Sequence, residues 1–261
     1  MNIVMIGDIF GEIGREMIEH YLPLVKQRYD VDLFIANGEN VTHGKGLNKR
    51  HYEELLFNGI SLITMGNHTY AKREIFDYID EADRLIVPFN RAKALPGTGS
   101  RVIECKGKKI RVTNLLGLTF MDGKPQNPFE AVQDVLANDE SDIHIIDFHA
   151  EATSEKLAFA NYVDGKVAAV LGTHTHVATA DERLLPKGTA YQSDVGMTGP
   201  YNSIIGCETE SIVDRFVKGI MTPFKIGEGE GQFNAVLLRI SDDNKVAAIE
   251  RIRIDPDHPL R

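Results

Sequence analysis

The stretch Ile3-Val4-Met5-Ile6-Gly7-Asp8 begins with a short apolar run and ends in a glycine and an aspartate. A brief run rich in β-branched residues and bounded by turn residues predicts a buried strand of a parallel sheet. Two further runs of this kind also end in a glycine and polar side chains: residues 33–36 before Gly38-Glu39-Asn40, and residues 61–65 before Gly66-Asn67-His68. The opening stretch is therefore predicted to be the first of several strands that end in polar residues.

Helical spacing of apolar residues fills the gaps between these runs. Helices are predicted from Gly14 to Tyr29, with a break or kink at Pro23, and from Asn48 to Asn58. Later elements are two hairpins, with turns at 106–109 and 242–244, and two buried strands, at 143–148 and 167–171, with a helix at 154–163 between them. This order predicts an α/β protein in which two sheets form a sandwich flanked by helices, as one domain over residues 1–261.

The composition is that of an ordinary globular protein, with 43% hydrophobic and 26% charged residues. The net charge of −9 argues against a broad surface for long nucleic acids, whereas a small anion can bind where metal ions supply positive charge. Cys105 and Cys207 lie far apart and outside any CxxC pattern, which favours a reducing cytosol. No run approaches the roughly 20 apolar residues of a membrane span, and no signal peptide is predicted.

Five polar motifs stand at the ends of the apolar runs: Gly7-Asp8, Gly38-Glu39-Asn40, Gly66-Asn67-His68, Phe148-His149 and Gly172-Thr173-His174-Thr175-His176. Because ligands bind beyond the carboxyl ends of parallel strands, we expect these side chains to meet. Carboxylate oxygens and neutral histidine nitrogens together suit Mn, Fe or Zn. Two ions about 3.5–4 Å apart stabilise both the attacking and the leaving oxygen in phosphoryl transfer. The motifs therefore predict a two-metal hydrolytic centre.

The histidines differ in the strength of their signal. His174 and His176 are one residue apart, so on an extended segment they would face the same side and serve two adjacent metals, the alternative being surface histidines on an edge strand. His149 ends a predicted strand and is interpreted as a ligand, although a lone histidine there is more often a core residue. Asp147, two residues earlier, is placed to support it. His144, deeper in the strand, is predicted to be structural.

His68 adjoins Asn67 and is predicted to lie to one side of the metal ions. There it would protonate a leaving oxygen or neutralise charge on the phosphoryl group, and an ordinary histidine pKa near 6.5 suits that role. The alternative is a loop histidine in solvent. Weaker candidates for a phosphate contact are Lys45, in the glycine-rich loop that also holds His43, and Arg15.

In their order along the chain, the motifs resemble the signature of calcineurin-type metallophosphoesterases: GDxH, GDxxD, GNH[DE], H and GHxH. Three departures stand out. Phe10 occupies the histidine position of GDxH, Glu39-Asn40 stands where the bridging aspartate is expected, and Thr173 alters GHxH. This variant pattern, together with the sequence SDVGMTGP at 193–200, resembles the YmdB-type branch of that superfamily over nearly the whole chain.

The resemblance implies a four-layer αββα sandwich and a residue-by-residue assignment of the site. Glu39 would bridge two metals. Asp8, Asn40 and His176 would complete the first site, with Asn40 making up for the histidine missing at Phe10. The second site would be completed by Asn67, His149 and His174. His68 would be the acid or charge stabiliser.

The resemblance also implies an activity: hydrolysis of cyclic nucleotides such as 2′,3′-cyclic AMP, by attack of a hydroxide held between two divalent ions. Iron or manganese is expected, with zinc or magnesium as alternatives. The family is bacterial and cytoplasmic, and homo-oligomers are common in it. Two other hypotheses stay open, a phosphomonoesterase or nuclease on the same scaffold, and a regulatory protein that senses a metal or nucleotide and acts through a partner. The acidic balance weighs against a nuclease that grips long strands.

Overall fold

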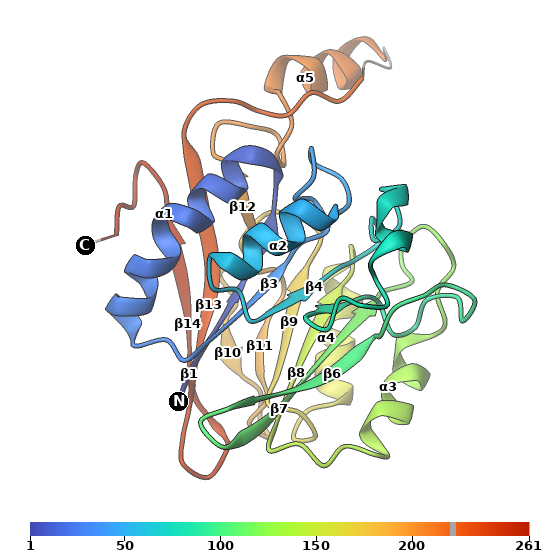
Figure 1. Ribbon diagram of the computed structural model, residues 1–261, viewed down its shortest axis with the longest axis vertical. Helices are drawn as coiled ribbons and strands as arrows, with labels where there is room; N and C mark the ends of the chain where they lie inside the picture. Colours follow the sequence, from blue (N-terminus) through green and yellow to red (C-terminus); the bar gives the residue numbers. More distant parts are fainter. Residues whose placement is uncertain (220–222, 261) are drawn as a thin grey trace.

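The computed structural model describes residues 1–219 and 223–260, so residues 220–222 and 261 of the predicted domain lie outside the described residues. Two β-sheets form its centre (Figure 1). The eight-stranded sheet has the order β2-β12-β13-β1-β3-β4-β5, with β14 paired to β13. Its strands are β1 (Asn2–Ile6), β2 (Asp8–Ile9), β3 (Leu33–Asn37), β4 (Leu62–Thr64), β5 (Leu85–Ile86), β12 (Met197–Pro200), β13 (Gly231–Ile240) and β14 (Val246–Ile254).

The six-stranded sheet has the order β10-β11-β9-β8-β7-β6. Its strands are β6 (Ser100–Cys105), β7 (Lys108–Leu116), β8 (Ile143–His149), β9 (Ala169–Thr173), β10 (Arg183–Leu184) and β11 (Ala190–Gln192). The helices are α1 (Gly11–Tyr29), α2 (Lys49–Phe57), α3 (Pro128–Leu136), α4 (Thr153–Tyr162) and α5 (Thr209–Lys218), and a short 3-10 helix covers Arg73–Asp77. Figure 1 shows α5 projecting at the top of the molecule.

The two-residue periodicity of β1 explains the layers. Val4 and Ile6 belong to a core that includes Ile18 of α1 and Leu55 of α2, whereas Ile3 belongs to a core shared with the six-stranded sheet. A third core joins that sheet to the helices on its far side, with residues such as Phe148, Val132 and Phe159. These three cores separate four layers, which confirms the predicted αββα sandwich of two mixed sheets.

Strand directions bring the polar motifs to one edge. β1, β3, β4 and β5 run parallel, as do β7, β8, β9 and β11 in the other sheet. Antiparallel pairs confirm both predicted hairpins, β6 with β7 and β13 with β14.

Among the described residues, the structure contains no helix both long and apolar enough to cross a membrane.

One prediction about the helices needs correction, and two helices were not predicted. α1 continues through Pro23, so the helix does not break there. Pro23 lies on the exposed side of α1 while Leu22 and Val25 beside it are buried, so packing holds the helix and water can solvate the carbonyl that proline leaves unpaired. Helices α3 and α5 were not predicted. For α3 the signal was present, since Asn127 caps it and Pro128 occupies its first turn.

Candidate metal centre

The candidate ligands come from strand-end loops of both sheets. Glu39 and Asn67 lie just after β3 and β4, whereas His149 is the last residue of β8 and His174 follows β9 directly. Asp8 differs, since it begins the short strand β2 after Gly7. The loops meet because the parallel strands of each sheet present their carboxyl ends at the same edge.

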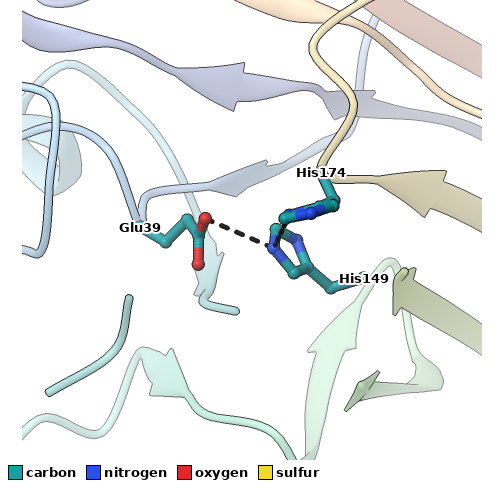
Figure 2. A group of neighbouring side chains, drawn as sticks. All are labelled: Glu39, His149 and His174. Atoms are coloured by element: carbon teal, nitrogen blue, oxygen red, sulfur yellow. Dashed lines mark hydrogen bonds and ion pairs between the residues drawn. The ribbon is translucent and has the colours of Figure 1, made fainter. Parts of the chain in front are cut away.

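His149 is at the centre of the most compact group. Its ring nitrogen Nε2 lies 2.9 Å from Asn67 Oδ1, 3.1 Å from His174 Nδ1 and 3.2 Å from Glu39 Oε1. Figure 2 shows Glu39, His149 and His174 converging from three separate segments of the chain. Ligand atoms of these three residues all lie within 4.8 Å of one another. The structure therefore brings Glu39, the proposed bridging residue, together with the residues proposed for the second metal site, Asn67, His149 and His174.

The side chains proposed for the first metal site, Asp8, Asn40 and His176, lie farther apart. Asp8 Oδ1 lies 3.9 Å from His176 Nε2 and 3.9 Å from His149 Nδ1. Asn40 Nδ2 lies 3.2 Å from His68 Nδ1 and donates to the carbonyl of Gly44. These side chains face the same edge, but they do not form a group as compact as the one around His149.

The residues present fit divalent cations. Asp8 Oδ1 and Asn40 Oδ1 are buried and have no hydrogen-bond donor within the described residues. Leaving a buried acceptor unpaired costs about 1–3 kcal/mol, and a cation would satisfy both oxygens. The backbone at Gly66 passes close to the same group, since an added Cβ would collide with Glu39 Oε2 at 2.3 Å and with His149 Nε2 at 2.4 Å. A set of carboxylate, amide and imidazole donors gathered in this way is typical of transition-metal sites.

Burial and mutual charge shift the pKa values of this group. Burial raises the pKa of Asp8 to about 6, although the nearby His176 and His149 act to lower it. Although burial opposes ionisation of Glu39, His149 and His68 hold its pKa well below the usual range. The pKa of His149 shifts in the opposite direction. Burial opposes its positive charge, but Glu39 and Asp8 raise its pKa to about 9. Burial and the charge of His149 lower the pKa of His174 to about 3, which leaves His174 neutral and ready to bind a metal.

His174 and His176 do not lie on the predicted extended segment. The strand β9 ends at Thr173, and His174 and His176 have φ values of 101° and 66°. Few residues other than glycine adopt this left-handed region, so contacts elsewhere must hold the loop. The side chains consequently diverge: His174 faces His149, whereas His176 packs edge-on against Phe10 and lies 3.0 Å from the carbonyl of Ile205.

A buried ion pair holds this loop. Lys156 Nζ lies 2.8 Å from Asp194 Oδ2 and donates to the carbonyl of Thr173 at 2.9 Å. The same Asp194 oxygen accepts the backbone N–H of Thr175 at 2.9 Å. The ion pair therefore fixes the peptide groups on both sides of His174. Its backbone N–H is also fixed, at 3.2 Å from Asp8 Oδ2.

His68 lies beside the candidate ligand Glu39. Its Nδ1 is 3.2 Å from Glu39 Oε1, and its backbone N–H donates to Glu39 Oε2 at 2.9 Å. The side chain is 27% exposed, and its Nε2 makes no hydrogen bond within residues 1–219 and 223–260. One ring nitrogen therefore faces the candidate ligands while the other is left for a substrate.

A cavity of about 470 Å³ adjoins His68. It is lined by side chains that include Lys45, Asn67, Tyr70, Arg91, Leu95 and Leu116. Lys45 is thus the one weaker phosphate candidate that the structure places near the site. Arg15 instead pairs with Glu54 at 3.1 Å and donates to two carbonyl groups, so it joins α1 to α2.

Sequence reasoning missed four residues that support the site. Thr173 lies 2.9 Å from His149 Nδ1, and Glu151 Oε2 lies 3.1 Å from His174 Nε2. The other two are Lys156 and Asp194, which form the buried ion pair. The position of Thr173 and Glu151 beside the histidine motifs was a usable signal. Nothing local to Lys156 indicates that its charge is buried, because its partner is far along the chain.

The chain resembles known proteins over nearly its full length. A family model described as "YmdB-like protein" matches residues 4–252. A Bacillus subtilis (strain 168) protein named 2′,3′-cyclic-nucleotide 2′-phosphodiesterase is 46% identical over 261 residues, which cover 99% of this chain and 98% of the relative. A crystal structure of a novel phosphatase from Mycoplasma pneumoniae is 40% identical with a TM-score of 0.93, and covers 99% of this chain and 95% of that one.

A more distant likeness concerns the fold alone. The 5′-nucleotidase precursor of Thermus thermophilus has a TM-score of 0.59 at 11% identity, covering 99% of this chain and 55% of that one. The family match over residues 4–252 and the two near relatives cover nearly the whole chain, and the solved relative has the same fold. The chain therefore belongs to the YmdB-like family, a branch of the calcineurin-like metallophosphoesterases.

Proposed function

We propose that this protein is a metal-dependent phosphodiesterase that hydrolyses small cyclic nucleotides such as 2′,3′-cyclic AMP with two divalent ions. The observation that carries the proposal is the convergence of Asn67, His174 and Glu39 on Nε2 of His149. The name of the Bacillus subtilis relative supports the reaction and the substrate class. Iron or manganese best suits the mixture of nitrogen and oxygen donors.

Each candidate residue has a proposed part in the centre. Glu39 would bridge the ions, with Asn67, His149 and His174 at the compact site and Asp8, Asn40 and His176 at the open one. Divalent ions held there would neutralise phosphoryl oxygens and lower the pKa of bound water toward neutrality. This local positive charge would let a protein of net charge −9 bind an anion.

His68 is proposed to act on the leaving group. Its Nδ1 lies against Glu39, which orients the ring, and its other nitrogen, Nε2, is free to donate a proton to the departing ribose oxygen. The cavity of about 470 Å³ beside it would take the nucleoside. A space of this size fits a small ligand.

Metal analysis and substrate profiling test the proposal together. We expect freshly purified protein to contain a transition metal, and to turn over 2′,3′-cyclic AMP and bis-p-nitrophenyl phosphate when manganese or iron is supplied. p-Nitrophenyl phosphate serves as the monoester control. Protein that binds no metal and shows no turnover would refute the proposal, and turnover of the monoester alone would favour a phosphomonoesterase.

A further inference from the structure

A group of buried polar side chains lies on the Nδ1 side of the His149 ring. Asp147 is at its centre, two residues before His149 on β8. Asn37 and Thr64, from the larger sheet, and Thr173, from β9, all contact its carboxylate. The side chains of this group are fully buried. None of them belongs to the proposed ligand set, and they join the two sheets directly beneath it.

The direction of each hydrogen bond follows from the acceptors available. Asn37 Nδ2 lies 3.1 Å from the carbonyl of Met65, which can only accept, so the same amide nitrogen donates to Asp147 Oδ2 at 3.2 Å. Thr173 Oγ1 lies 2.6 Å from Asp147 Oδ1 and 2.9 Å from His149 Nδ1. A hydroxyl carries one hydrogen, and Thr173 directs it to the carboxylate. His149 Nδ1 must therefore be the donor to Thr173.

We propose that Thr173 is a positioning residue that keeps His149 in the tautomer with hydrogen on Nδ1. The lone pair of Nε2 then faces the candidate ligands, as Figure 2 shows for Glu39 and His174. This inference rests on the proposed metal centre. Metal-binding histidines commonly donate their second N–H to a carboxylate or carbonyl, which fixes the ring. Here the threonine hydroxyl connects the ring to Asp147.

Three variants isolate the hydroxyl. Thr173→Val removes it and keeps the shape of the side chain, while the contact from Lys156 to the carbonyl of residue 173 remains available. Thr173→Ser restores a hydroxyl. Thr175→Val is the matched control, because Thr175 lies in the same loop and its hydroxyl makes no hydrogen bond among the residues that the structure describes.

The first measurement reads the tautomer directly. Nitrogen-15 NMR of the histidine rings, in protein loaded with diamagnetic Zn²⁺, should show a hydrogen-bonded hydrogen on Nδ1 of His149 and none on Nε2 in the wild type, Thr173→Ser and Thr175→Val. In Thr173→Val the Nδ1 hydrogen should lose the chemical shift of a hydrogen-bonded N–H. A ring that carries its hydrogen on Nε2 in the wild type would overturn the inference, and this result does not depend on whether any variant folds.

The second measurement is the affinity for Mn²⁺ by calorimetry. We expect Thr173→Val to bind about 10–100-fold more weakly, as is typical when a partner of a ligating histidine is lost, and the two other variants to match the wild type. Equal affinity of a folded Thr173→Val would contradict the inference. The proposed function fails separately: protein with the Nδ1 tautomer that binds Mn²⁺ but hydrolyses no phosphodiester would sink the function and keep the inference.

Discussion

The strand β8 carries a histidine near each end, and the two are surrounded differently. His144 lies near the start of the strand, with Nδ1 2.7 Å from Asp139 Oδ2 and Nε2 2.9 Å from the hydroxyl of Thr113. His149, at the other end, has one hydrogen-bond partner at Nδ1 but three candidate ligands around Nε2. Both rings are buried, so burial alone does not separate them.

What separates the two ends is whether the donors and acceptors match. Each nitrogen of His144 has a single neighbour, a carboxylate oxygen at ion-pair distance from Nδ1 and a hydroxyl at Nε2, so no group of candidate ligands gathers at either nitrogen. Around Nε2 of His149, an amide oxygen, a carboxylate oxygen and a second ring nitrogen all lie within 3.2 Å, and a single N–H could serve only one of them well. A divalent cation would satisfy all of them. Cavity size alone would select the other end of the strand, since a cavity of about 780 Å³, larger than the one beside His68, lies next to His144.

The largest expected effect comes from replacing each histidine of β8 in turn. His149→Gln should lose bound metal and turnover together, because it removes the nitrogen on which the other candidate ligands converge. His144→Gln should keep both and lose about 1–3 kcal/mol in the free energy of unfolding, from unpaired buried groups. Metal content by mass spectrometry and urea unfolding check the pair. Loss of metal in His144→Gln would break the comparison.

His68 has one nitrogen against the candidate ligand Glu39 and one without a hydrogen-bond partner in the described part of the chain, which sets it apart from both histidines of β8. We expect His68→Ala to keep its metal and to lose about 10²–10⁴-fold in kcat, the usual range for a general acid. The measurement is steady-state turnover of 2′,3′-cyclic AMP alongside metal analysis. Normal turnover in a metal-loaded variant would show that His68 has no part in the reaction.

At the His144 end, the prediction concerns stability and pH. Burial opposes ionisation of Asp139, but contacts with His144, Ser141 and Arg111 outweigh it and lower its pKa. Because the pKa is lower in the folded protein, the stabilisation is present at neutral pH and is lost as the pH falls below about 4. Asp139→Asn should therefore cost about 1–3 kcal/mol near neutrality.

Urea unfolding of the wild type and Asp139→Asn, at neutral pH and again at a pH below about 4, measures this difference. The gap between them should narrow in acid while metal binding at neutral pH stays the same in the two proteins. A gap that is independent of pH would mean that the charge of Asp139 contributes nothing to stability.

The smallest expected effect distinguishes the two cavities. Ala92 lines the cavity beside His68, and Ala137 lines the larger one at the opposite end. Both are exposed, so each accepts a larger side chain. Ala92→Trp should raise the KM for 2′,3′-cyclic AMP about tenfold, equivalent to about 1.4 kcal/mol, because it takes up space for the nucleoside. Ala137→Trp should leave KM unchanged, and equal effects would exclude the cavity beside His68 as the binding site.

The sequence predicted what depends on local pattern. Apolar runs ending in glycine located β1, β3 and β4, and the order of these runs was enough for the two-sheet sandwich. The helix α1 was found, but its continuation through Pro23 depends on packing that no local pattern records. Long-range contacts decide such cases.

The candidate site shows the same limit. Strand-end motifs located Glu39, Asn67, His149 and His174, and these four lie together. The predicted extended conformation of the loop with His174 and His176 was wrong, because the left-handed backbone at His174 is held by residues far away along the chain. Spacing of one residue between two histidines determines a shared face only when the segment is a strand.

The ion pair of Lys156 and Asp194 has a consequence for how the protein loads metal. Fixing the backbone of one residue costs about 1–2 kcal/mol of conformational entropy, and here the loop is fixed by contacts that form on folding. An arriving ion would then not have to order His174 itself, and a departing ion would leave the loop in place. We therefore expect the protein to exchange metal ions repeatedly without unfolding, so that the ion it holds is set by affinity and supply and not by which ion was present when the chain folded.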